Sequence, residues 1–244
     1  MTEINIPIYY INLEKSTDRN HNMISQLTNY NYTRFPAIDD NHIIFKKYND
    51  LIKSKYCKDS KKLACLLSHL YAIKKAYDTN LENIIIFEDD VDLTIFNQVY
   101  RKTTILFSKL RNTEIFQLFS SNINFYNKPN KLIRIEHKYG MWGACGYIIN
   151  FKGMKKIMDL YNYKYDKFDI INYNNYYLSD VLLYDICRTV TFNVPFINLK
   201  SPSIYKSTLE NDTNPNGIHL QKNIDYINSI KDDIIKTIEE SEIS

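Results

Sequence analysis

The sequence is poor in cysteine, glycine and tryptophan, with 4, 5 and 1 of these residues in 244. No two cysteines are spaced as Cys-x-x-Cys, which argues against a disulfide framework and favours free thiols in a reducing compartment. No apolar run reaches the roughly 18 residues that a membrane-spanning helix needs. The N-terminus also lacks the basic start and apolar run of a signal peptide. We therefore expect a cytoplasmic protein without a transmembrane segment.

The charge balance is close to neutral. The 31 basic and 28 acidic residues leave a net charge of +3, which is too small to indicate a nucleic-acid partner. Asn, Ile, Lys and Tyr are abundant and have A/T-rich codons, which indicates an A/T-rich genome such as that of a virus or a bacterium. The apolar content of 44% is typical of a globular chain. Without repeats or linkers, the sequence favours one domain.

One apolar run leads directly into three carboxylates. Residues 84–87 read Ile-Ile-Ile-Phe, as in a strand that is buried on both faces. Glu88, Asp89 and Asp90 follow, and adjacent charges at a buried strand end are costly unless a cation neutralises them. Oxygen ligands suit Mg²⁺ or Mn²⁺. In an extended segment Glu88 and Asp90 would share one side. A solvated acidic turn is the alternative that these residues leave open.

The order of the expected elements is typical of an α/β protein with a parallel sheet. Strands are expected at residues 6–13, 32–35, 84–87, 115–120, 131–135, 147–150 and 189–195. Helices are expected at residues 17–28, 63–77, 96–110, 152–161, 179–187 and 224–238. Loops are expected at 162–177 and 196–220. The isoleucines of the last helix form one stripe, which predicts packing on the domain, with a homodimer contact as the alternative.

Four segments, in this order, resemble glycosyltransferase family 25, which includes lipopolysaccharide and collagen galactosyltransferases. The segments are Ile8–Leu13 with Asp18-Arg19, Cys65–Leu70 running into Phe87–Asp90, Trp142–Tyr147, and Ser179-Asp180. Residues 34–39 resemble the family's turn after its second strand. One departure stands out. The family's Gly-Glu-Ile-Gly run before the cysteine reads Lys61-Lys62-Leu63-Ala64 here, so an acid and two glycines of the donor side are missing.

The resemblance implies a single GT-A domain, with a Rossmann-like, mostly parallel sheet flanked by helices. Residues 1–120 would bind the nucleotide sugar, residues 121–220 would face the acceptor, and residues 221–244 would form a C-terminal helix. The implied reaction is inverting transfer of a hexose from a UDP-sugar to a glycan or glycoprotein hydroxyl, assisted by Mn²⁺ or Mg²⁺. The altered segment 61–64 motivates an alternative, a catalytically silent homologue that binds carbohydrate or acts as a scaffold. A metal-dependent hydrolase would need more clustered acids and histidines.

The resemblance also implies roles for individual residues. The implied metal ligands are Glu88, Asp90 and His219. The implied donor-binding residues are Asn12, Asp18, Arg19, Asp39, Ser68, His69 and Asp89. Asp180 would be the general base that takes the proton of the attacking hydroxyl, with Asp185 as the second choice. Trp142 and Gly143 would wall the acceptor sugar. The purely structural alternatives are a core histidine for His69, a core tryptophan for Trp142 and a first-turn acid for Asp180.

Overall fold

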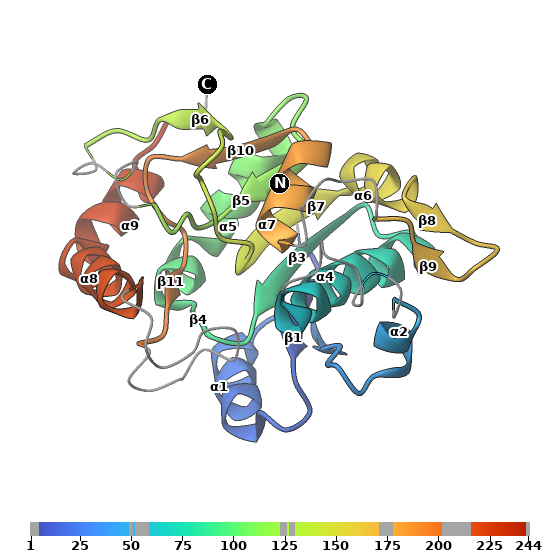
Figure 1. Ribbon diagram of the computed structural model, residues 1–244. Coiled ribbons are helices and arrows are strands. Elements are labelled where there is room, and N and C mark those ends of the chain that lie inside the picture. Colours follow the sequence, from blue (N-terminus) through green and yellow to red (C-terminus); the bar gives the residue numbers. More distant parts are fainter. Residues whose placement is uncertain are drawn as a thin grey trace.

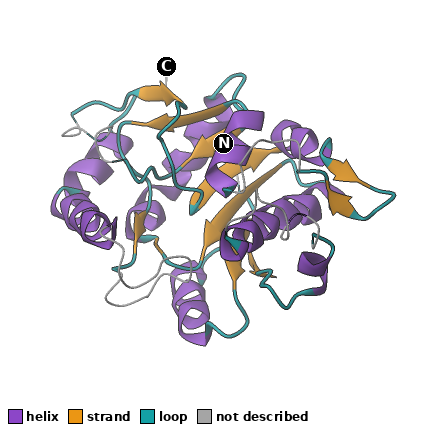
Figure 2. Cartoon of the chain, in the orientation of Figure 1, coloured by secondary structure: helices purple, strands orange, loops and turns teal. Residues whose placement is uncertain are grey.

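The structure is a computed structural model that describes residues 5–48, 51, 59–122, 126, 130–170, 178–201 and 216–242, without the side chains of residues 216–219. In these residues a seven-stranded sheet lies between helices on both of its faces (Figures 1 and 2). In spatial order its strands are β2 (Tyr32–Pro36), β1 (Ile8–Asn12), β3 (Asn83–Glu88), β7 (Gly146–Asn150), β5 (Ile115–Gln117), β10 (Thr189–Phe192) and β6 (Arg134–Glu136).

Most strands of this sheet point in one direction. Strand β1 pairs in parallel with β2 and β3, and β7 runs antiparallel between β3 and β5. Strand β10 is parallel to β5 and antiparallel to β6. Strands β2, β1, β3, β5 and β10 therefore share a direction, which β7 and β6 oppose. A mostly parallel sheet covered by helices confirms the predicted α/β fold class.

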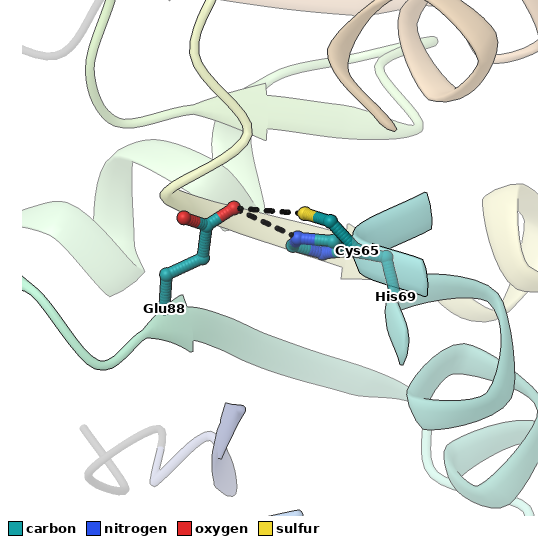
Figure 3. Close-up of side chains that lie close together, drawn as sticks. All are labelled: Cys65, His69 and Glu88. Carbon is teal, nitrogen blue, oxygen red and sulfur yellow. Dashed lines mark hydrogen bonds and ion pairs between the residues drawn. The ribbon is translucent and has the colours of Figure 1, made fainter. Parts of the chain in front are cut away.

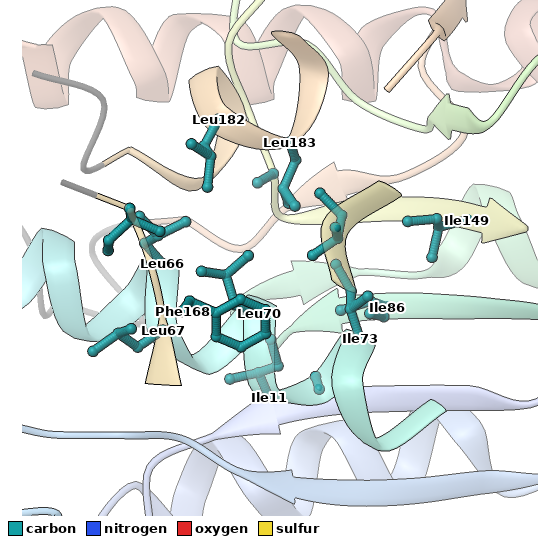
Figure 4. Packing of buried hydrophobic residues seen from close by; sticks show 14 of the residues in the cluster. Ile11, Leu66, Leu67, Leu70, Ile73, Ile86, Ile149, Phe168, Leu182 and Leu183 are labelled. Atoms are coloured by element: carbon teal, nitrogen blue, oxygen red, sulfur yellow. The ribbon is translucent and has the colours of Figure 1, made fainter. Parts of the chain in front are cut away.

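The central strands are apolar on both sides because helices cover both faces of the sheet. Ile84 and Ile86 of β3 belong to one core, and Ile85 and Phe87 belong to the other. Figure 4 shows the first core, where sheet residues meet leucines of the helices above them. It includes residues of α4 (Ser60–Asp78), α6 (Phe151–Met158) and α7 (Ser179–Ile186). The second core includes residues of α1 (Thr17–Leu27) and α5 (Thr94–Lys109). Side-chain alternation along β3 thus explains an apolar run with no polar residue.

Helix α4 begins three residues before the predicted start. The Asp59 side chain caps it by accepting hydrogen bonds from the backbone N–H groups of Lys61 and Lys62. The helix ends at Asp78, and Asn80 follows with φ of 55°, a left-handed conformation that suits asparagine after a helix. Its N-terminal half lies beside the carboxyl end of β3 (Figure 1). This placement brings polar side chains of α4 to the acidic turn.

The C-terminal third differs from the sequence-based expectation. The predicted last helix is two helices, α8 (Asn216–Ser229) and α9 (Lys231–Glu239), separated at Ile230. The predicted loop 196–220 includes a short strand, β11 (Asn198–Leu199), which pairs with β4 (Val91–Asp92). In the predicted loop 162–177, β8 (Tyr161–Asn162) and β9 (Lys167–Phe168) form a hairpin, while residues 171–177 lie outside the described ranges. Short elements that pair only with each other leave little periodic signal.

The isoleucine stripe of the C-terminal helices is used inside the chain. Ile227, Ile234 and Ile238 are fully buried in the second core, and α9 packs against α5. Packing on the domain is therefore confirmed, whereas dimerisation through this segment stays a prediction. A short helix, α2 (Ile43–Lys46), follows the loop after β2. In the described ranges, no helix is both long enough and apolar enough to span a bilayer.

Candidate active site

A cleft of about 200 Å³ opens at the carboxyl ends of β1 and β3. Four segments line it: the end of β1 with the start of α1, residues 37–40 after β2, the first half of α4, and the acidic turn. The predicted site residues that line it are Arg19, Asp39, Ser68, His69, Glu88, Asp89 and Asp90. Ligands of open α/β sheets bind at this edge because strand ends and helix N-termini meet there. The topology therefore gathers most of the predicted donor-side residues.

Glu88 is held by the side chains of α4 (Figure 3). Its Oε1 lies 3.1 Å from His69 Nε2 and 3.7 Å from the sulfur of Cys65, whose thiol donates to it. The other ring nitrogen of His69 lies 3.0 Å from the hydroxyl of Tyr147. Burial acts against the charged form of Glu88, but His69, Cys65 and Arg19 outweigh it and lower the pKa of this carboxyl. Glu88 is therefore a carboxylate at neutral pH, oriented by a fully buried histidine.

Asp89 is part of a buried ion pair. Its Oδ1 accepts a hydrogen bond from Arg19 at 2.9 Å, and its Oδ2 accepts one from the Asn12 amide at 2.7 Å. The amide oxygen of Asn12 in turn accepts from Arg34 Nε at 2.9 Å. Burial raises the pKa of Asp89, although Arg19 and Asn12 oppose this. The structure thus places Asn12, Arg19 and Asp89 in one network that fixes the acidic turn to β1 and α1.

Asp90 is the least neutralised carboxylate of the turn. Its Oδ1 is buried and has no hydrogen-bond partner in the described part of the chain. Arg19 lies 3.9 Å from its other oxygen, Oδ2. Burial, together with the charges of Glu88 and Asp89, raises the pKa of Asp90 to about 7. An orphaned carboxylate oxygen beside another carboxylate is a site that a divalent cation would complete.

The geometry of the turn differs from the expected extended segment. Strand β3 ends at Glu88, and Asp89 and Asp90 form a turn before β4. Alternation along a strand therefore does not decide where Asp90 points, and the argument from an extended Glu88-x-Asp90 segment was wrong. The turn forms because β4 leaves the main sheet to pair with β11, and Lys200 N–H donates to the backbone carbonyl of Asp90 at 2.8 Å.

Three predicted donor-side residues have different surroundings. The Ser68 hydroxyl accepts from Ile38 N–H and donates to the Ala64 carbonyl, both at 2.8 Å, so it ties the segment after β2 to α4. Asp39 is half-buried and faces the cleft. Asp18 is exposed in the first turn of α1 and does not line the cleft. The structure thus brings two of the three to the cleft.

The predicted acceptor side lies next to the donor cleft. Asp180, in the first turn of α7, accepts a hydrogen bond from Gly143 N–H at 2.9 Å. The neighbouring Ser179 hydroxyl lies 3.8 Å from the Cys65 sulfur, so α7 meets α4 at the cleft. Burial is the main cause that raises the pKa of Asp180, and the charge of Glu88 adds to it, against the Gly143 N–H. Glu88 and Asp180 are therefore close enough for the charge of one carboxylate to act on the other.

The loop around Trp142 is fixed by its backbone and exposes its aromatic rings. Gln117 Nε2 donates to the Met141 carbonyl at 2.9 Å, and the Tyr184 hydroxyl donates to the Gly143 carbonyl at 2.8 Å. Gly143 has φ of +121°, a backbone angle that residues with a side chain rarely adopt. Trp142 is 46% exposed and meets Tyr139 edge to face, with ring centroids 6.2 Å apart. The alternative of a core tryptophan is therefore wrong.

Some residues of the site were not among those predicted. Cys65 and Tyr147 complete the surroundings of Glu88 and His69, and Lys15 and Lys61 line the cleft. The spacing of Cys65 and His69, four residues apart on one helix face, was a usable signal. Tyr147 could not be found in this way, because only the β3–β7 pairing brings it to His69. His219 lies in the first turn of α8, and its side chain is outside the described residues.

The donor atoms of Cys65, His69 and Glu88 lie within 4.8 Å of one another and could together hold a metal ion. A helix-covered α/β sheet with a carboxylate cleft at its strand ends is typical of enzymes that bind small ligands at this edge. The sequence model of glycosyltransferase family 25 (LPS biosynthesis protein) matches residues 5–172, and the chain belongs to this family. The match includes the cleft and the Trp142 loop but ends before α7. No curated protein matches the chain.

Proposed function

We propose that this glycosyltransferase moves a hexose from a UDP-sugar to a hydroxyl of a glycan or glycoprotein, with inversion and with the help of Mn²⁺ or Mg²⁺. The observation that carries the proposal is the acidic turn in the cleft, where Asp90 keeps a buried carboxylate oxygen without a partner. Glu88 and Asp90 would hold the ion. A bound divalent cation would neutralise the negative charge that develops on the diphosphate leaving group.

The remaining cleft residues suit a nucleoside diphosphate. Lys15 and Lys61 add positive charge to the same cleft, where a diphosphate would be attracted. Lys61 stands where the family has the first glycine of its Gly-Glu-Ile-Gly run, so a cation is gained there, and Lys62 stands in place of the lost acid. Asp39, on the loop after β2, would accept hydrogen bonds from the ribose or the uracil. Asn12 and Arg19 would act indirectly, because they hold Asp89 and so keep the turn in place.

Asp180 is the proposed general base. An inverting transfer forms a bond from the acceptor oxygen to the anomeric carbon while the bond to the diphosphate breaks, and the acceptor proton goes to the base. The raised pKa of Asp180 brings it closer to neutral pH, where general bases are most effective. Trp142 and Gly143, linked to Asp180 through the Gly143 N–H, would wall the acceptor sugar.

The first experiment is UDP release from a panel of UDP-hexoses, with and without Mn²⁺, in the presence of mixed glycan acceptors. We expect Asp180→Asn to bind UDP with wild-type affinity and to lose about 10²- to 10⁴-fold in transfer rate. Asp185→Asn is the matched control, because Asp185 is an exposed carboxylate on the same helix. Equal losses in the two variants would remove Asp180 as the base. Glycan binding without any affinity for UDP and Mn²⁺ would instead favour the silent homologue.

A further inference from the structure

We propose that Cys65, His69 and Glu88 form a binding site for a transition-metal ion of the Zn²⁺ type, separate in kind from the Mg²⁺ or Mn²⁺ ion of the donor. The three side chains converge from two elements, with Cys65 and His69 on α4 and Glu88 at the end of β3 (Figure 3). Each offers a different ligand atom, namely sulfur, nitrogen and oxygen. Mg²⁺ and Mn²⁺ prefer oxygen ligands, whereas thiolate and imidazole select Zn²⁺ and similar ions.

The distances between the ligand atoms agree with a tetrahedral zinc site. Zinc bonds of about 2.3 Å to sulfur and about 2.0–2.2 Å to nitrogen and oxygen place the ligand atoms roughly 3.4–3.6 Å apart. The Glu88 oxygen lies 3.1 Å from His69 Nε2 and 3.7 Å from the Cys65 sulfur. All three atoms lie within 4.8 Å of one another. Both distances from the Glu88 oxygen are therefore within a few tenths of an ångström of the tetrahedral values.

The contact of His69 with Tyr147 also supports a zinc site. His69 is fully buried, and its Nδ1 lies 3.0 Å from the Tyr147 hydroxyl, which leaves Nε2 facing Glu88 and Cys65. Metal-binding histidines are commonly oriented in this way by a partner on the other ring nitrogen. All three side chains also line the cleft, so an ion can enter and a water molecule can take the fourth position.

Zinc binding would act on the proposed transferase reaction, and this part rests on the proposed function. The ion would displace the thiol proton of Cys65 and the proton between His69 and Glu88, both of which pass to solvent. It would also take Glu88 away from the ion that the donor diphosphate needs. Zn²⁺ bound in the donor cleft is therefore expected to inhibit transfer in the presence of Mn²⁺.

Co²⁺ added to the full-length protein tests the site without any substrate, because a thiolate ligand gives an intense sulfur-to-cobalt absorption band. We expect one equivalent of Co²⁺ to give this band, Zn²⁺ to abolish it, and Mg²⁺ to leave it unchanged. Cys65→Ser should remove the band and weaken Zn²⁺ binding by at least about 100-fold, while Tyr147→Phe should weaken it about 10-fold. Cys187→Ser is the matched control, since Cys187 is a buried thiol that contacts Gly153 instead.

The outcomes separate the two proposals. Absence of the band in wild type, or a band that survives Cys65→Ser in a folded variant, would overturn the zinc site. Glu88→Gln provides a second variant, expected to bind Zn²⁺ at least about 10-fold more weakly, with a cooperative melt to show that the variant is folded. Inhibition by Zn²⁺ is measured against each variant's own rate, and Cys65→Ser should relieve it. If no UDP-sugar is turned over at all, the proposed function fails while the cobalt spectrum still decides the metal site.

Discussion

Asp90 is the residue on which the donor side depends most. It sits in the turn after β3 with a buried, unpartnered Oδ1, next to the charges of Glu88 and Asp89. By contrast, Asp92 accepts a hydrogen bond from Thr94 N–H at 2.9 Å and lies 3.4 Å from Lys200 Nζ. Asp90 thus has one oxygen without a partner and the other 3.9 Å from Arg19, whereas Asp92 has several close partners. Two acids of similar sequence context therefore have opposite needs for a cation.

Asp90→Asn should lower the Mn²⁺-dependent transfer rate by about 10²- to 10³-fold, because it removes a charge that stabilises the bound ion. It should not destabilise the fold, since it removes repulsion from Glu88 and Asp89. The control Asp92→Asn should keep the transfer rate and lower the melting temperature. Rate measurements over a Mn²⁺ titration, with thermal melts of both variants, check this. A rate loss in Asp92→Asn as large as in Asp90→Asn would contradict the assignment.

Glu114 is also a buried carboxylate, and its charge contributes to stability. Its buried carboxylate accepts from Lys156 Nζ at 2.7 Å and from Arg188 N–H at 2.8 Å, with Lys152 Nζ at 3.3 Å. Burial alone would raise its pKa, but Lys156, Arg188 N–H and Lys152 outweigh burial and lower the pKa below the usual value. The negative charge of Glu114 is thus favoured by folding.

Glu114→Gln should reduce the free energy of unfolding at pH 7 by about 1–3 kcal/mol, because a neutral amide accepts more weakly from Arg188 N–H than a carboxylate does, while the exposed lysines contribute little. A lowered folded-state pKa gives stabilisation above the unfolded-state pKa of about 4.3 that is lost as the pH falls through the folded-state value. Urea unfolding at pH 7 and pH 3 measures this. The gap between wild type and variant should narrow at pH 3, and a constant gap would show that charge is not the cause.

At the scale of elements, the loop between β6 and β7 combines a rigid backbone with exposed rings. Its carbonyls are held by Gln117 and Tyr184, and its Gly143 N–H is held by Asp180. A side chain at Gly143 would meet the Phe119 carbonyl at 3.2 Å besides requiring a positive φ. Such a loop cannot easily collapse, so Trp142 and Tyr139 stay available to a sugar whose C–H face stacks on an aromatic ring.

The single tryptophan makes this loop directly observable. Trp142 is the only tryptophan in the chain, so emission changes report on this loop alone. We expect lactose or maltose to shift and saturate the emission of wild type, and Tyr139→Ala to weaken that response several-fold by opening one side of the ring pair. Tyr163→Ala, on the exposed β8–β9 hairpin, should respond like wild type. An emission spectrum unchanged by either disaccharide, or by acceptor glycans that support turnover, would count against an acceptor role for Trp142.

At the scale of the whole molecule, two cores on opposite faces of one sheet serve different purposes. The first contains α4 and α7, which carry His69, Cys65 and Asp180 to the cleft. The second contains α5 and the C-terminal helices, and no described residue of these helices lines the cleft. Changes in α5 or in the C-terminal helices should therefore lower stability without altering the site.

Ile234→Ala tests this separation. Ile234 is fully buried in α9, and truncating a buried isoleucine leaves a cavity that costs about 2–5 kcal/mol. We expect lower stability in urea but unchanged affinity for UDP and Mn²⁺ in the folded protein. Sedimentation of wild type and variant addresses the homodimer prediction as well. If the wild type is a dimer and the variant a monomer, the isoleucine stripe contributes to subunit contact in addition to its packing in the chain.

Sequence patterns alone determined the main elements and the acidic turn. The apolar run 84–87 and the spacing of leucines in α4 both follow from burial. They can therefore be recognised without knowledge of the fold. The charge density of Glu88, Asp89 and Asp90 likewise marks a site from local chemistry. The family resemblance added His69, Trp142 and Asp180 as candidates, and no periodicity could single out Trp142 or Asp180.

Only the tertiary structure decided how the side chains of the site are paired. The sequence does not say that Arg19 and Asn12 bind Asp89, that Tyr147 orients His69, or that the residues after Glu88 form a turn. These contacts join residues as much as 78 positions apart, and they arise from strand order and from β4 pairing with β11. Long-range pairing depends on the packing of the whole chain, which local patterns do not encode. Glu88, Asp89 and Asp90 are adjacent and chemically alike in the sequence, but the fold gives each of them a different environment.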